Sequence, residues 1–296
     1  MAQAASVRPD ASEASPLAVI CGGGTLPFAV ADALIGSGRS VYLLAIEGFA
    51  DRAAVARYPH DWIAVGRFGR MLRLLREAGC RDVTCIGTMV RPALRDMRLD
   101  WTTLRMLPQL YRLFRGGDDH LLSGVARLFE QQGLRLLGPH EVAPEILVQD
   151  GVLTSTQPTA RDLADAAHGF ALLDAIGPFD VGQAAVVADK HVLAVEAVEG
   201  TDAMLLRVAE LREQGRIAPS DRTGVLVKAP KPAQELRLDL PAIGPQTVDG
   251  VRRAGLRGIM LRAGAVMIAE PFAVKEAADR AGIFVVGVNP EAAPGP

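Results

Sequence analysis

Residues 17–36, LAVICGGGTLPFAVADALIG, decide the fold class of this 296-residue chain. An apolar run at 17–21 is followed by three glycines and then by apolar residues at helical spacing, which predicts a strand, a tight turn and a helix. The alternation returns downstream, with strands expected at 41–46, 62–65, 83–86 and 134–137 and a helix at 67–78. Strands that alternate with helices are typical of a parallel sheet with crossover helices. The sequence therefore predicts an α/β fold whose first half contains a parallel sheet.

The second half is expected to be a less regular, mixed α/β domain. Thr159 and Asp162 resemble a capping box at the start of a helix that runs to residue 176. Strands at 184–188 and 191–198 are expected to form a hairpin. The predicted organisation is a disordered leader at 1–15, an N-terminal domain at 16–138, a linker at 139–151 and a catalytic C-terminal domain at 152–296.

Composition narrows the class of protein. Hydrophobic residues make up 49% of the chain, which is ample for two cores, and the formal net charge of -2 argues against a nucleic-acid partner. The three cysteines form no CxxC pair, which predicts a reduced, cytosolic protein. No run of about 18 apolar residues is present to span a bilayer.

Positive charge is concentrated in one region, because residues 66–115 contain 11 arginines and 4 acidic residues. Arg67, Arg70, Arg73 and Arg76 recur at every third residue of one expected helix. A solvated helix face is one interpretation. The alternative is docking to anionic lipid headgroups, which contribute about 1 kcal/mol per basic residue near the membrane surface.

The glycine turn is a candidate phosphate site, because glycines let a backbone approach phosphate and the following helix offers free N–H donors. Gly22, Gly23, Gly24 and Thr25 are the candidate substrate-binding residues of this turn. The dinucleotide fingerprint GxGxxG fails at its third glycine, where the chain has Pro27. Neither nicotinamide nor flavin is therefore expected, whereas a phosphate or nucleotide contact and a purely structural turn both stay open.

Residues 194–205, AVEAVEGTDAML, form an acidic cluster where a strand leads into a helix. The strand carries Glu196, and the turn after it brings Glu199, Thr201 and Asp202 to the start of the helix. Mg²⁺ is usually held by one or two carboxylates together with substrate phosphates, so Glu199 and Asp202 are candidate metal ligands and Thr201 a candidate substrate contact. Helix capping by Thr201 or Asp202 is the alternative.

Residues 224–247, GVLVKAPKPAQELRLDLPAIGPQT, gather charged side chains between prolines. Glu235, Arg237 and Asp239 alternate with leucines, which predicts a strand with charges on one face and leucines on the other. Cations, an amide and carboxylates together suit a polyanionic substrate and a metal, whereas an ordinary edge strand with a solvated face is the alternative. The candidate substrate-binding residues here are Lys228, Lys231, Gln234 and Arg237.

Taken together, these motifs resemble the LpxI-type UDP-2,3-diacylglucosamine pyrophosphatases of lipid A biosynthesis. The most specific are AVEAVEGTDAML at 194–205 and KAPKPAQELRLDLPAIGPQT at 228–247, and GGGTLP at 22–27 and GDDHLL at 117–122 support them. The resemblance runs from residue 17 to residue 288. Ala233 departs from the glycine expected there, and Glu235 stands where aspartate is common, which leaves the geometry of the turn before the expected strand open.

The resemblance implies a Rossmann-like N-terminal domain, a C-terminal domain particular to the family, and a substrate held between them. It implies Mg²⁺-dependent hydrolysis of UDP-2,3-diacylglucosamine to UMP and lipid X, which is 2,3-diacylglucosamine 1-phosphate. The expected location is the cytoplasm, peripheral to the inner membrane at its cytoplasmic face. No nucleic acid is expected as a partner, and a homodimer is left open.

Asp239 matches the family's essential aspartate. Our hypothesis is that Asp239 holds Mg²⁺ or orients the attacking water, with Glu199 and Asp202 as further metal ligands. Lys228, Lys231 and Arg237 would offset the phosphoryl charge. Two other classes stay open, a non-catalytic protein that binds a nucleotide sugar or lipid, and a Rossmann oxidoreductase, which Pro27 disfavours.

Overall fold

The computed structural model describes residues 15–89, 98–106, 118–217, 223–232 and 234–289. These residues divide into two compact units, the first within Met1–Arg112 and Val125–Ala143 and the second within Leu113–Gly124 and Pro144–Pro296. Of the leader predicted at residues 1–15, all but Ser15 lies outside the described residues. None of the described helices is both long enough and apolar enough to cross a bilayer.

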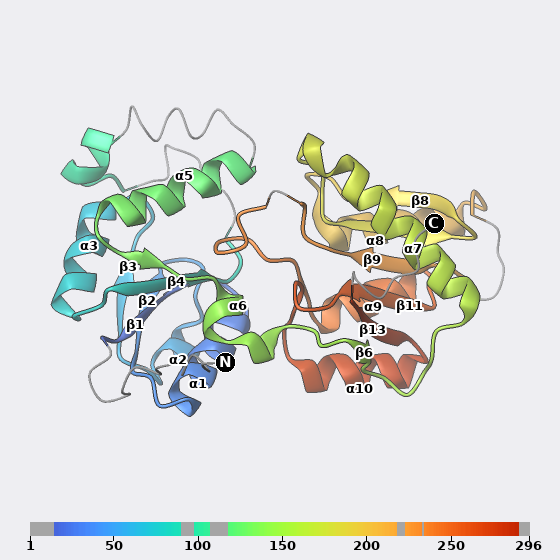
Figure 1. Cartoon of the computed structure of the whole chain (residues 1–296), viewed down its shortest axis with the longest axis horizontal. Helices are drawn as coiled ribbons and strands as arrows, with labels where there is room; N and C mark the ends of the chain where they lie inside the picture. The colour runs from blue at the N-terminus through green and yellow to red at the C-terminus, as the bar shows by residue number, and fades with distance from the viewer. Residues whose placement is uncertain (1–14, 90–97, 107–117, 218–222, 233, 290–296) are drawn as a thin grey trace, which may run out of the picture. The chain divides into compact units, whose positions relative to one another are not determined.

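The first unit contains a five-stranded parallel sheet in the order β3-β2-β1-β4-β5 (Figure 1), which confirms the predicted parallel sheet. All of β1 is buried, as expected for a central parallel strand covered by helices. On one face, Leu75 of α3 and Phe129 of α5 belong to the same core cluster as Ile20. The elements are β1 (Leu17–Cys21), α1 (Leu26–Gly36), β2 (Val41–Ile46), α2 (Arg52–Val55), β3 (His60–Ile63), α3 (Phe68–Glu77), β4 (Asp82–Ile86), α5 (Asp118–Gln131), β5 (Arg135–Leu136) and α6 (Pro139–Val142). Of α5, the residues from Val125 onward belong to this unit.

The second unit is built on a six-stranded mixed sheet in the order β6-β13-β11-β9-β7-β8, which confirms the mixed α/β class expected there. Two further strands, β10 and β12, form a separate two-stranded parallel sheet. The elements are β6 (Gly151–Val152), α7 (Ala160–Ile176), β7 (Ala184–Ala188), β8 (His191–Val195), α8 (Gly200–Glu213), β9 (Val225–Lys228), β10 (Ala242–Ile243), α9 (Pro245–Arg253), β11 (Gly258–Arg262), β12 (Met267–Ile268), α10 (Pro271–Ala281) and β13 (Phe284–Val288).

Alternation along β9 gives the second unit two cores. Leu226 packs with residues of α8, α9 and α10, whereas Val225 and Val227 pack with α7 on the other face. Lys228, two residues beyond Leu226, therefore lies on the face that α8 covers. The predicted capping box is present, since Thr159 Oγ1 accepts from Asp162 N, and the predicted β7–β8 hairpin is also confirmed.

The strand predicted at 235–240 is wrong, because these residues form a turn. The carbonyl of Glu235 accepts hydrogen bonds from the backbone N–H groups of Leu238 and Asp239, both at 3.0 Å. Proline has no N–H to donate, so the flanking segments cannot extend a ladder from β9. Leu240 is buried, but Leu238 is only partly so, and the leucines therefore share no single buried face. The flanking prolines are Pro230, Pro232 and Pro241.

Candidate active site

Lys228 is the buried cation of the second unit. It ends β9, and its side chain reaches the first turn of α8, where Nζ donates to Thr201 Oγ1 at 2.8 Å and to the carbonyl of Ala242 at 3.0 Å. The residue is only 7% exposed. Burial lowers the pKa of the Lys228 ammonium, and the negative charges of Glu196, Asp202 and Asp239 oppose that shift. A buried ammonium among carboxylates is an arrangement found at functional sites.

Thr201 links this ammonium to a buried carboxylate. Its hydroxyl accepts from Lys228 and donates to Glu196 Oε1 at 2.9 Å, while Glu196 Oε2 accepts from the backbone N–H of Gln183 at 3.0 Å. Gly182 permits this approach, because a Cβ there would lie 2.5 Å from the carbonyl oxygen of Glu196. A continuous hydrogen-bonded path therefore runs from β9 through α8 to the start of β7.

Asp239 is fixed by two amides. Its Oδ2 accepts from Gln183 Nε2 at 3.0 Å and also from Gln234 Nε2, which in addition donates to the Asp239 carbonyl at 3.0 Å. The Gln234 amide is itself oriented, since its Oε1 accepts from the backbone N–H of Lys231 at 2.9 Å. These two amides fix the orientation of the Asp239 carboxylate. Gln183 thus contacts both Glu196 and Asp239.

The other two predicted cations have acidic partners. Lys231 forms an ion pair with Asp180, and its side chain is 9% exposed. Arg237 makes a two-pronged contact with Glu235, in which Nε and Nη2 each lie 2.8 Å from a carboxylate oxygen. To contact a phosphate, each cation would have to bind it alongside its acidic partner or release that partner.

The two further metal candidates lie at the start of α8 in different surroundings. Glu199 precedes the helix and accepts from Arg207 Nη2 at 2.9 Å. Asp202 is exposed in the first turn of the helix, and its charge acts on Lys228. Neither Thr201 nor Asp202 is the capping residue, because the N-cap position belongs to Glu199.

A magnesium site of the kind predicted would need substrate oxygens. Among the described residues, no three His, Cys, Asp or Glu side chains are grouped so that they could hold a metal ion by themselves. Mg²⁺ typically takes one or two carboxylates and completes its shell with water and phosphate oxygens. Asp239 and Asp202 carry the carboxylate oxygens that Mg²⁺ prefers, and the charges of both act on the Lys228 ammonium.

The glycine turn lies in the first unit, at the carboxyl ends of β1 and β4, where the strand order changes direction. Ligands bind preferentially at such switch points. Gly22 and Gly23 are buried against the end of β4, and a Cβ on Gly22 would lie 2.9 Å from the Thr88 carbonyl oxygen. Gly24 has a φ of +86° and no atom near its Cβ position, and both it and Thr25 are exposed before α1. Close packing therefore explains Gly22 and Gly23, whereas Gly24 and Thr25 are exposed.

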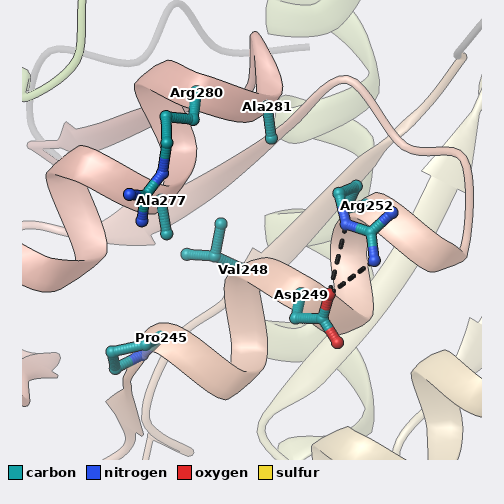
Figure 2. Close-up of a pocket in the computed structure, with 7 residues that line it drawn as sticks. All are labelled: Pro245, Val248, Asp249, Arg252, Ala277, Arg280 and Ala281. Atoms are coloured by element: carbon teal, nitrogen blue, oxygen red, sulfur yellow. Dashed lines mark hydrogen bonds and ion pairs between the residues drawn. The ribbon is translucent and has the colours of Figure 1, made fainter.

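A pocket of about 250 Å³ between α9 and α10 is separate from these residues (Figure 2). Its guanidinium groups have partners on their own helices, since Arg252 donates to Asp249 and Arg280 to Glu276. No residue of the hydrogen-bonded path lines it. We assign it no chemistry.

The three cysteines are poorly suited to act as nucleophiles. Burial raises the pKa of Cys21 and of Cys85 to about 12 and that of Cys80 to about 11, so all three thiols are protonated at neutral pH. None of them is joined in a disulfide.

The structure therefore brings together Thr201, Lys228, Gln234 and Asp239, four of the predicted residues. Gln183 was missed, because a glutamine before a buried strand carries no chemical signature in the sequence. Glu196 was noticed as part of the acidic cluster but given no role. The signal that could have found Gln183 is Gly182, which marks a close backbone approach.

Comparisons with known proteins cover both units. The family models that match are the LpxI N-terminal domain at residues 16–146 and the LpxI C-terminal domain at residues 149–286. The UDP-2,3-diacylglucosamine pyrophosphatase LpxI of Caulobacter vibrioides is 43% identical over 279 residues, which cover 94% of this chain and 99% of that protein. The C-terminal match includes Lys228 and Asp239, and the N-terminal match includes the glycine turn.

Proposed function

The chain belongs to the LpxI family, and from that premise we propose that it hydrolyses UDP-2,3-diacylglucosamine to UMP and lipid X. The observation that carries the proposal is the placement of Asp239. This carboxylate is held by two amides within the field of a buried ammonium, in the domain that matches the family's C-terminal model.

Hydrolysis of the pyrophosphate bond requires that its negative charge be offset and that a water molecule be activated. The pyrophosphate bridge carries two negative charges that repel a nucleophile. In the reaction a water oxygen bonds to one phosphorus, the bond from that phosphorus to the bridging oxygen breaks, and the water gives up a proton. A bound Mg²⁺ would supply Lewis-acid stabilisation of phosphoryl oxygens and lower the pKa of coordinated water. We propose that Asp239 and Asp202 hold it, with Glu199 as a further candidate.

Lys228 suits the role of phosphoryl clamp. An ammonium has three N–H donors, and within the described residues two of them serve Thr201 and Ala242. We propose that the third donates to a phosphoryl oxygen of the substrate, and a preorganised donor of this kind contributes about 3 to 4 kcal/mol to the transition state. Lys231 and Arg237 are proposed to add positive charge, and Gln234 to orient Asp239.

The glycine turn is proposed as the contact for the nucleotide part. The N-terminus of α1 presents backbone N–H groups beside exposed Gly24 and Thr25, and such termini favour phosphate. Because the substrate carries two acyl chains, we propose that the chain works peripherally at the cytoplasmic face of the inner membrane.

The test is release of UMP from UDP-2,3-diacylglucosamine in nonionic detergent micelles. With Mg²⁺ we expect UMP and lipid X in equal amounts, with EDTA no release, and recovery when Mg²⁺ is restored. Hydrolysis that EDTA leaves unchanged would contradict the metal requirement. Substrate binding with no UMP under any divalent metal would instead support the non-catalytic binding protein.

A further inference from the structure

In the first unit, α3 lies beside a short helix at residues 101–106 (Figure 1). Both carry exposed basic side chains, and the short helix also carries an exposed tryptophan. Met71, Leu72 and Leu75 are the buried residues of α3. At 100° per residue, Arg70 and Arg73 fall on the opposite side of the helix. The docking face is defined here as Arg70, Arg73, Arg98, Trp101, Leu104 and Arg105.

The two helices are joined by specific contacts. The backbone N–H of Phe68 donates to Thr103 Oγ1 at 3.0 Å, and that of Arg70 donates to Asp100 Oδ2 at 2.9 Å. Gly69 lets them meet, because a Cβ there would lie 2.4 Å from Thr102 Oγ1. The two segments that carry the docking face are therefore packed against each other in the first unit.

Its positive charge is not cancelled locally. Within the described residues, no carboxylate forms an ion pair with any of its four guanidinium groups. Asp82 is already paired with Arg39 and Arg135. Burial raises the pKa of Asp100, but hydrogen bonds from Thr103 and from the backbone of Arg70 and Gly69 outweigh it, so the pKa is lowered and the carboxylate is internally bonded.

Large apolar side chains are exposed on the same face. Trp101 is 69% exposed and Leu104 is 40% exposed. The guanidinium of Arg105 lies 5.5 Å from the centre of the Trp101 ring. A tryptophan beside arginines is typical of segments that lie at the boundary between lipid headgroups and acyl chains.

We propose that this docking face seats the protein on an anionic phospholipid bilayer. The proposal rests on the proposed function in one respect, because an enzyme acting on a diacylated substrate must reach a membrane. Charge complementarity identifies the partner as anionic, and exposed Trp101 and Leu104 favour a bilayer over nucleic acid. The net charge of -2 points the same way, since nucleic-acid-binding domains carry an overall basic excess.

Vesicle co-sedimentation of the full chain tests this. Vesicles of phosphatidylethanolamine and phosphatidylglycerol should bind the protein, pure phosphatidylcholine vesicles should not, and about 1 M salt should release it. The double reversal Arg70→Glu/Arg73→Glu should lower partitioning by about 30-fold or more, given the contribution of each basic residue near the surface. Trp101→Ser should lower it several-fold.

Matched controls lie on the second unit. Arg216→Glu/Arg280→Glu changes the net charge equally, and Phe272→Ser removes an aromatic side chain that is 90% exposed. Both should bind vesicles as the unaltered chain does. Failure of the unaltered chain to bind anionic vesicles, equal losses in control and test variants, or displacement of vesicles by a duplex oligonucleotide would overturn the proposal.

Hydrolysis in detergent micelles separates this proposal from the enzymatic one. The Arg70→Glu/Arg73→Glu variant should release UMP from micellar substrate at the unaltered rate. Vesicle binding without any UMP release by the unaltered chain would remove the proposed hydrolysis and leave the docking face in place.

Discussion

At the scale of single residues, Lys228 and Asp239 carry opposite charges in one region of the second unit and are held by different means. Lys228 is buried, and its ammonium donates to two neutral oxygens, the Thr201 hydroxyl and the Ala242 carbonyl. Two amides hold one oxygen of Asp239. A held carboxylate near a buried ammonium provides the two kinds of charge that hydrolysis of a pyrophosphate uses.

The lowered pKa of Lys228 has a measurable consequence. Its ammonium should deprotonate below the ordinary lysine value of about 10.4, so hydrolysis should decline as pH rises through that lower value. Because the unfolded chain binds this proton more tightly, the contribution of Lys228 to the free energy of unfolding should increase with pH over the interval between the two pKa values.

An NMR titration of lysine side chains labelled with ¹³C at Cε measures this pKa directly. The chain has only four lysines, and Lys228→Met assigns the resonance of interest. The signal that Lys228→Met removes should titrate below the ordinary lysine value of about 10.4. A Lys228 signal that titrates at or above that value would contradict this prediction.

At the scale of elements, the turn at residues 235–240 shows where sequence patterns mislead. Alternation of leucines with charges predicted a strand, but a strand needs a neighbour, and the flanking prolines cannot supply ladder donors. The segment is bent instead, and one of the two amides that fix Asp239 comes from Gln183, 56 residues earlier. A contact between residues so far apart in the sequence produces no local pattern from which it could be predicted.

Elements whose signal is local were predictable. The continuous apolar run of β1 and the capping box at Thr159 each depend on adjacent residues, and both are present where expected. In the candidate site, Lys228, Thr201, Gln234 and Asp239 could be named from charge, motif and family resemblance. Gln183 carries no such signature of its own, and the only sequence signal near it is Gly182, which marks a close backbone approach but not a contact with Asp239.

The two amides should matter for turnover more than for binding. Gln183→Ala should lower kcat by roughly tenfold with KM little changed, because Asp239 would lose one of the donors that orient it. Steady-state kinetics with Gln246→Ala as an exposed control tests this. A change in KM alone, or an equal effect in the control, would show that Gln183 does not position Asp239.

The glycine turn separates a structural requirement from a functional one. Gly22→Ala should lower the stability by about 1 to 3 kcal/mol, because its Cβ would meet backbone atoms of Gly87 and Thr88 at 2.9 Å. Gly24→Ala meets no neighbour, and its cost is confined to the positive φ, about 1 kcal/mol. Thermal unfolding of the two variants should therefore place Gly22→Ala at the lower Tm, and the reverse order would contradict this reading of the turn.

At the scale of the whole molecule, each unit contributes a different kind of chemistry. The first carries the exposed glycine turn and the docking face, and the second carries the acidic and basic side chains around Lys228. The net charge of -2 hides the basic excess of residues 66–115, because the rest of the chain has an excess of acidic residues. The alternation of strand and helix patterns could predict α/β structure, whereas the substrate is inferred only through the family to which both halves belong.

The most direct measurement is UMP release from UDP-2,3-diacylglucosamine by Asp239→Ala in the presence of Mg²⁺, beside Asp249→Ala as a control on α9. The account predicts no release above background from Asp239→Ala, with substrate still bound and the circular dichroism spectrum unchanged, and normal release from the control. Near-normal UMP release by Asp239→Ala would contradict the assignment of this carboxylate as the centre of the reaction.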